Sequence, residues 1–140
     1  MKDRSLQKIK KDLAIISSNK LNPSQSILLF MGLTFEILMR RDLFARNIDL
    51  KEFVEKVYIE KTEKKEPFKD YLYVSRTLLA SRLNKLILKE LNYTKVLDIC
   101  RDIQSILPSE EDIRKNKPPK SQDEDVTEWM NFLEKNRSKQ

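Results

Sequence analysis

Residues 22–41 read NPSQSILLFMGLTFEILMRR and contain the longest apolar stretch of the chain, Ile27 to Met39. Asparagine is a favourable helix N-cap, and proline suits the first helical position because its missing N–H would have no partner there. The pair Asn22-Pro23 therefore predicts the start of a helix that runs to about Arg41. Apolar side chains cover nearly the whole circumference of this helix, so we expect it to be buried at the centre of the fold.

Four other segments carry apolar side chains at helical spacing. They are residues 3–18, a segment that Asp49 caps and that ends near Glu60, a segment from Pro67 to about Leu91, and a segment from Asn92 to Leu107. Residues 60–66 contain no apolar side chain, which predicts a solvated loop or a frayed helix end. The chain has a single glycine, whereas the hairpins and bulges of a β-rich fold need several. These observations predict an all-α fold, a compact bundle of about five helices within residues 1–108.

The composition of the chain changes after Pro108. Residues 109–124 are polar and contain Pro118-Pro119, which predicts a linker. Residues 123–134 contain five acidic and no basic side chains, and we expect a short helix over residues 125–136 with Asp125 as its cap. The apolar stripe of this helix supplies the predicted partner-binding residues, which are Val126, Trp129, Met130 and Leu133.

We consider three alternative binding sites for this linker-tethered C-terminal helix. Its apolar side can enter the groove of a partner protein while its acidic side chains meet a basic rim. It can also pair with a second copy of the chain, or dock as a sixth helix on its own bundle. We favour docking on its own bundle, because the bundle is basic and is the nearest complement.

The composition also excludes several classes of function. Histidine is absent and Cys100 is the only cysteine, which removes the commonest general base, the commonest metal ligand and any disulfide within the chain. Cys100 lies on an apolar helical stripe, the usual pattern of a small buried thiol. We therefore expect no catalysis, no metal and no cofactor, and a reducing compartment such as the cytoplasm. The longest apolar stretch is shorter than the roughly 20 residues of a membrane span, so no membrane partner is expected.

Residues 73–88 read YVSRTLLASRLNKLIL, and in composition they resemble the recognition helix of helix-turn-helix regulators. Such helices carry hydroxyl, arginine and asparagine side chains that contact bases and phosphates, with leucines on the inner face. The resemblance implies a reading helix at residues 75–88 in which Arg76, Arg82 and Lys85 contact nucleic acid. It covers one helix, and the short turn and first helix of the motif are not matched. A core helix with a polar outer face is the alternative that we favour.

Arg76 falls beside Leu72, Leu79 and Leu83 on the apolar side of its predicted helix. Glu36 is likewise the only charged residue inside the apolar stretch of the central helix. Arginine is rarely buried without a partner, so we expect a structural ion pair between Glu36 and Arg76. A phosphate or carboxylate ligand held by Arg76 is the functional alternative.

The predicted function follows from the excess of basic over acidic residues and from the apolar helix faces. The formal net charge is +6, and Arg40 and Arg41 end the central helix, where positive charge offsets the helix dipole. We expect a non-catalytic adaptor or accessory protein that acts through protein–protein contacts or self-association. The alternative is a nucleic-acid-binding regulator in which Arg40, Arg41 and the residues of the reading helix contact phosphates and bases.

Overall fold

The structure, a computed structural model, describes residues 5–108 of the chain. Over that range the chain forms five α-helices, two short 3-10 helices and no strand, which confirms the predicted all-α bundle. The elements are α1 (Leu6–Ser17), α2 (Pro23–Met39), α3 (Asn47–Val57), η1 (Ile59–Lys61), η2 (Asp70–Tyr73), α4 (Arg76–Glu90) and α5 (Tyr93–Ile106). The predicted linker and acidic helix lie outside the described residues.

Side-chain caps begin four of the α-helices. The Asn22 side chain accepts a hydrogen bond from the Gln25 N–H at 2.8 Å, and the Gln25 side chain accepts one from the Asn22 N–H at 3.4 Å. This reciprocal capping box satisfies two N–H groups at the start of α2. The side chains of Ser5, Ser75 and Asn92 cap α1, α4 and α5. The helix starts predicted at Asn22 and Asn92 are therefore confirmed.

The start of α3, predicted at Asn47-Ile48-Asp49, is confirmed, but the predicted cap, Asp49, is wrong. The helix begins at Asn47 and places Asp49, the predicted cap, in its first turn. The two carboxylate oxygens of Asp49 accept hydrogen bonds from the Arg46 guanidinium at 2.9 and 2.7 Å. A carboxylate in the first turn also interacts favourably with the helix dipole, so Asp49 stabilises this helix end without capping it.

The predicted start of α4 at Pro67 is also wrong. The chain makes the short helix η2 and a break at Val74 before α4 begins at Arg76, with Ser75 as the cap. The solvated loop predicted for residues 60–66 is confirmed for residues 63–66, which are exposed. Thr62, by contrast, is buried and donates to the Ile59 carbonyl oxygen at 2.6 Å.

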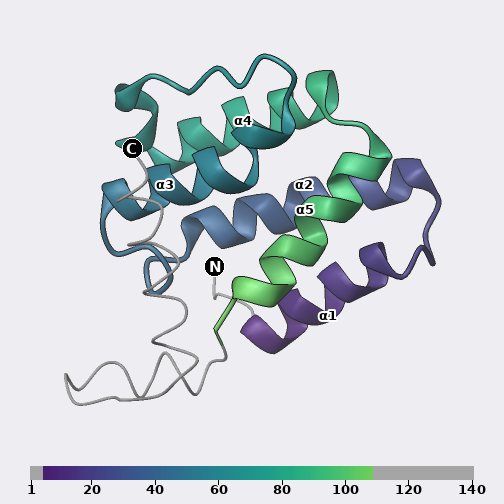
Figure 1. Cartoon of the computed structure of the whole chain (residues 1–140). Coiled ribbons are helices and arrows are strands. Elements are labelled where there is room, and N and C mark those ends of the chain that lie inside the picture. Colours follow the sequence, from purple (N-terminus) through teal and green to yellow (C-terminus); the bar gives the residue numbers. More distant parts are fainter. Residues whose placement is uncertain (1–4, 109–140) are drawn as a thin grey trace.

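Helix α2 lies at the centre of the bundle (Figure 1). It packs against α1 on one side and α4 on the other, and α5 crosses it. The first and last helices, α1 and α5, make the most extensive contact between any two of the described elements. Every described α-helix buries apolar side chains in one shared core, among them Leu13, Ile37, Val54, Leu83 and Ile99.

Four aromatic rings join α2 to the segment around α3. The Phe30 ring stacks on the Tyr58 ring with centroids 5.8 Å apart, and the Phe53 ring meets Tyr58 edge-on at 6.0 Å. Phe44 packs on Phe53 at 4.8 Å. The Tyr58 hydroxyl lies 2.9 Å from the Thr34 hydroxyl, so a buried hydrogen bond joins α2 to the end of α3. This cluster fixes which side of α2 faces inward.

We expect Tyr58→Phe to lower the free energy of unfolding by about 1–2 kcal/mol, because the buried Thr34 hydroxyl loses its partner. Adding Thr34→Val should then cost little more, since both polar groups are gone. A double-mutant cycle in urea, followed by circular dichroism, measures this coupling. Fully additive losses would mean that the two hydroxyl groups do not interact.

Candidate functional site

Arg76 is buried, as predicted, but its partners are not those expected. Its Nη1 atom donates to the carbonyl oxygens of Leu38 at 3.1 Å and Arg40 at 3.4 Å, and its Nη2 atom donates to the carbonyl oxygen of Phe44. The predicted ion pair with Glu36 is therefore wrong. The last carbonyl groups of a helix lack partners within the helix, and the guanidinium supplies those partners instead of meeting a carboxylate.

The position of Arg76 is also electrostatically favourable. A positive charge at the C-terminal end of α2 stabilises the helix dipole. Burial, and next the charge of Arg41, lower the pKa of the Arg76 guanidinium from its ordinary value, but arginine stays protonated in proteins. Arg76 thus clamps the start of α4 to the end of α2 and is not accessible to a phosphate ligand.

Arg40 is the second predicted nucleic-acid-binding residue that lies inside the fold. Its Nε and Nη2 atoms donate to the two carboxylate oxygens of Asp42 at 3.0 and 2.7 Å. Partial burial by itself would raise the pKa of Asp42, but the hydrogen bond and charge of Arg40 outweigh it and hold that pKa below its ordinary value. Among the remaining predicted residues, Arg41, Arg82 and Lys85 are exposed.

The side of α2 that faces away from the core is mostly apolar, and its one charged residue, Glu36, is half-buried one turn after Gly32. Leu28 is 65% exposed, Phe35 is 40% exposed and Gly32 between them is exposed, while Met31 and Met39 are half-buried beside them. These five residues form what we call the α2 outer face. Helix α2 is central, as predicted, but this side of it is exposed. The spacing of Leu28, Gly32 and Phe35, at i, i+4 and i+7, was the signal in the sequence for a separate exposed stripe.

Gly32 is the only glycine of the chain and stands in the middle of α2. It does not have a positive φ, and a Cβ atom added to it would meet nothing within 4 Å. Neither the backbone conformation nor the packing of the described residues therefore requires glycine here. Glycine in a helix interior costs about 1 kcal/mol relative to alanine. Its structural effect is a gap between Leu28 and Phe35 in which the helix backbone is accessible.

The two helices beside α2 have basic outer sides. On α1, Lys8 and Lys11 are exposed. On α4, Arg82, Lys85 and Lys89 are exposed, and the only acidic residue of that helix stands at its last position. Helix α2 lies between α1 and α4 (Figure 1), and both of these helices have exposed basic side chains.

A second set of exposed apolar side chains lies just after η2 and along α4. It includes Val74, Leu78 and Leu88, of which Leu88 is 63% exposed. On α4 these residues alternate with Arg82 and Lys85, so the surface is mixed in character. Single apolar side chains among charges are normal on protein surfaces, and the α2 outer face differs from this surface because its apolar residues are continuous.

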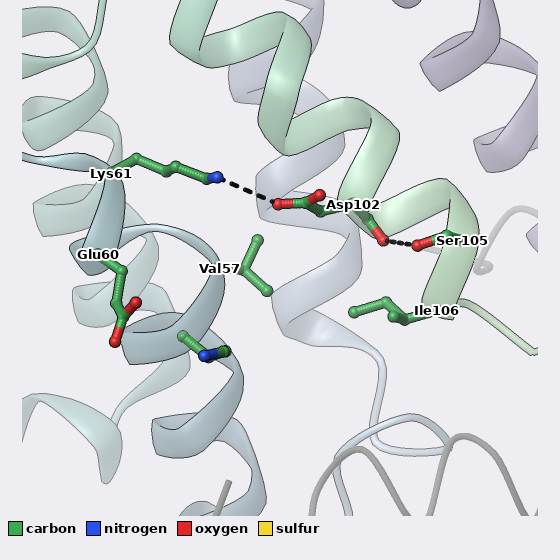
Figure 2. Close-up of a pocket in the computed structure, with 7 residues that line it drawn as sticks. Val57, Glu60, Lys61, Asp102, Ser105 and Ile106 are labelled. Atoms are coloured by element: carbon green, nitrogen blue, oxygen red, sulfur yellow. Dashed lines mark hydrogen bonds and ion pairs between the residues drawn. The ribbon is translucent and has the colours of Figure 1, made fainter.

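A shallow pocket of about 340 Å³ lies between the end of α3 and the end of α5 (Figure 2). Lys61 and Asp102 point toward one another across it, with Nζ and Oδ2 3.4 Å apart. The Ser105 hydroxyl donates to the backbone carbonyl oxygen of Asp102 at 2.8 Å. Two basic and two acidic residues line this pocket together with Val57 and Ile106, so it offers neither a net charge nor an enclosed cluster for catalysis.

Cys100 is completely buried in α5, as its place on an apolar stripe predicted. Burial raises the pKa of its thiol to about 12, against a small opposing effect of Arg101. A buried thiol of this kind is inert, because the thiolate is the nucleophile and the metal ligand. Within the described range, residues 5–108, no three His, Cys, Asp or Glu side chains are placed to hold a metal ion.

We expect the Cys100 thiol to react with a thiol reagent such as DTNB near pH 8 only after the chain unfolds. Both its burial and its raised pKa suppress the thiolate and block access. The rate of colour release, measured with and without urea, tests this. Rapid labelling of the native chain would mean that α5 opens locally.

The predicted partner-binding residues Val126, Trp129, Met130 and Leu133 lie outside the described residues. Among residues 5–108, no helix has the length and apolar character to span a membrane. Compared with known proteins, the chain matches no family model, no curated protein and no solved structure. The inference of function therefore rests on the surface of the bundle.

Proposed function

We propose that this protein is a non-catalytic adaptor or accessory protein whose α2 outer face binds a helix of a partner protein. The single observation that carries the proposal is the continuous exposed strip of Leu28, Gly32 and Phe35. In a chain with 36% charged residues, an exposed helical strip made of apolar side chains and glycine favours an interaction surface.

The side chains around this strip support one kind of partner. Leucine, methionine and phenylalanine side chains accommodate the apolar stripe of an amphipathic helix, and methionine adapts to different shapes. Basic residues on α1 and α4 favour a partner helix with acidic side chains along its flanks. The proposed partner element is therefore an acidic amphipathic helix.

The internal contacts of the charged residues support a non-catalytic role. Arg76 binds backbone carbonyl groups, and Arg40 binds the Asp42 carboxylate. Asp49 accepts two hydrogen bonds from Arg46. These side chains hold helix ends and turns in place, and a general acid or base would need a group placed toward substrate with a pKa near the working pH.

Site-specific photocrosslinking tests the proposal in the cells that produce the protein. Phe35 is replaced by benzoylphenylalanine, and Leu88 on α4, which is the more exposed of the two, is replaced in the control. We expect a crosslinked protein, identified by mass spectrometry, from position 35 and not from position 88. The purified partner should then bind the Phe35→Glu variant at least about tenfold more weakly than the native chain, as expected for a hot-spot residue. Equal affinities, or no crosslink at position 35, would refute the adaptor role of this face.

Nucleic acid binding is the second candidate function, and the exposed basic side of α4 favours it. Arg82 and Lys85 stand there, whereas Arg40 and Arg76 are engaged inside the fold. Fluorescence anisotropy with labelled random-sequence duplex and single-stranded DNA and RNA tests it, at low and at physiological salt. Binding that weakens steeply with salt and is lost in Arg82→Ala/Lys85→Ala would support this candidate. No binding at low salt would remove it.

A further inference from the structure

We propose that residues 123–134 of this chain dock on the α2 outer face of the same molecule, so that a partner must displace them. This inference rests on the proposed function in one respect, because it takes the α2 outer face as a docking surface. It adds the occupant of that surface in the absence of a partner, and thus a means of regulating access to it.

The shape of the α2 outer face fits the apolar stripe of this segment. Gly32 leaves a gap between Leu28 and Phe35 that the fold itself does not require. Such a gap lets a bulky side chain approach the helix backbone closely. Trp129 is the largest apolar side chain in the segment and the only tryptophan of the chain. We therefore place its indole ring over Gly32.

The charges of the segment fit the neighbouring helices. Residues 123–134 contain five acidic and no basic side chains. The two helices that pack against α2 have exposed basic residues, which are Lys8 and Lys11 on α1 and Arg82 and Lys85 on α4. A helix whose apolar stripe faces α2 directs its acidic side chains toward these two basic sides.

The chain between the bundle and the segment is long enough for this contact. Residues 109–122 connect Pro108, at the end of the bundle, to the segment, and extended chain spans about 3.3–3.6 Å per residue. Their reach is thus about 46–50 Å, whereas the 17 residues of α2 extend over about 25 Å. Docking within one molecule also benefits from the high effective concentration of a tethered segment.

Tryptophan fluorescence of the full chain tests this inference, because Trp129 is the only tryptophan and its emission reports its own surroundings. We expect the native chain to emit at shorter wavelength than the urea-unfolded chain and to resist acrylamide quenching, at every protein concentration. Phe35→Glu should shift the emission to the wavelength of the unfolded chain. Leu88→Glu, on the exposed side of α4, is the matched control and should leave the emission unchanged.

A second variant separates lost docking from lost folding. Gly32→Gln places a good helix former at an exposed helix position, so it should raise the thermal midpoint measured by circular dichroism. The same side chain fills the gap, so it should also expose Trp129 to the quencher. The inference would be overturned if Trp129 were exposed to the quencher in the native chain. It would also be overturned if Trp129 were shielded and neither α2 variant changed its emission or quenching. Emission that depends on protein concentration would also overturn it and would assign the α2 outer face to a second copy.

The failure of this inference and the failure of the adaptor role give different results. If Trp129 is exposed while position 35 still crosslinks to a partner, the adaptor role stands and the segment does not regulate it. If Trp129 docks on α2 and no partner crosslinks at position 35, the segment is a permanent part of the bundle and the adaptor role fails.

Discussion

Replacing Arg76 by methionine is expected to lower the free energy of unfolding by about 3–5 kcal/mol, because buried carbonyl groups lose a charged hydrogen-bond donor. Methionine is apolar and fills much of the same volume, but it cannot donate hydrogen bonds. The carbonyl groups of Leu38 and Phe44 would then lose this donor inside the fold, whereas the Arg40 carbonyl group keeps the N–H groups of Leu43 and Phe44 as donors. The end of α2 would also lose the positive charge that offsets its dipole.

Chemical denaturation followed by circular dichroism measures this loss, and two variants calibrate it. Arg76→Lys keeps the charge but has a single nitrogen in place of the planar fork, so an intermediate loss is expected. Arg82→Met on the exposed side of the same helix should change stability by no more than about 0.5 kcal/mol. If Arg76→Met were as mild as Arg82→Met, the clamp on α2 would not contribute to stability.

Phe30→Ala is expected to cost about 3–5 kcal/mol, and Phe35→Ala on the same helix about 1 kcal/mol. Phe30 is completely buried and stacks on Tyr58, so its removal leaves a cavity in the aromatic cluster. Phe35 lies on the α2 outer face and is partly exposed, so its removal takes away fewer packing contacts. The two substitutions remove the same atoms from neighbouring turns of one helix, so their difference reports the orientation of α2.

Urea denaturation of both variants gives this difference directly. It also bears on function, because a residue that contributes little to stability and much to partner binding is available for recognition. Equal losses of several kcal/mol would place Phe35 in the core and would remove the α2 outer face as a docking surface.

The sequence predicts the helices well where local side chains decide their starts. The Asn22 capping box and the Asn92 cap lie within a few residues of the N–H groups that they satisfy, so both are visible without a fold. The role of Asp49 in α3 and the start of α4 depend on wider context. Asp49 has the chemistry of a cap but binds Arg46, and α4 begins at the position from which Arg76 reaches the end of α2.

The candidate site is less predictable from the sequence, and the reason is geometric. Spacing along a helix shows that Leu28 and Phe35 share a face, but it does not show which apolar faces the neighbouring helices cover. The hydrogen-bond partners of Arg76 also could not be predicted from the sequence, because every residue has a backbone carbonyl group and nothing in the sequence marks the ones that accept. Burial of Arg76 and of Cys100 followed from their places on apolar stripes, and both are confirmed.

The extensive contact between α1 and α5 has a consequence for how the protein folds during synthesis. Domains form as the chain emerges from the ribosome, beginning with the N-terminal part. The apolar stripe of α1, which includes Ile9 and Leu13, lacks its main partner until residues 93–106 have been made. The nascent chain therefore carries an incompletely covered hydrophobic helix, with α2 as its chief early partner, and this helix is a target for chaperones until α5 has been made.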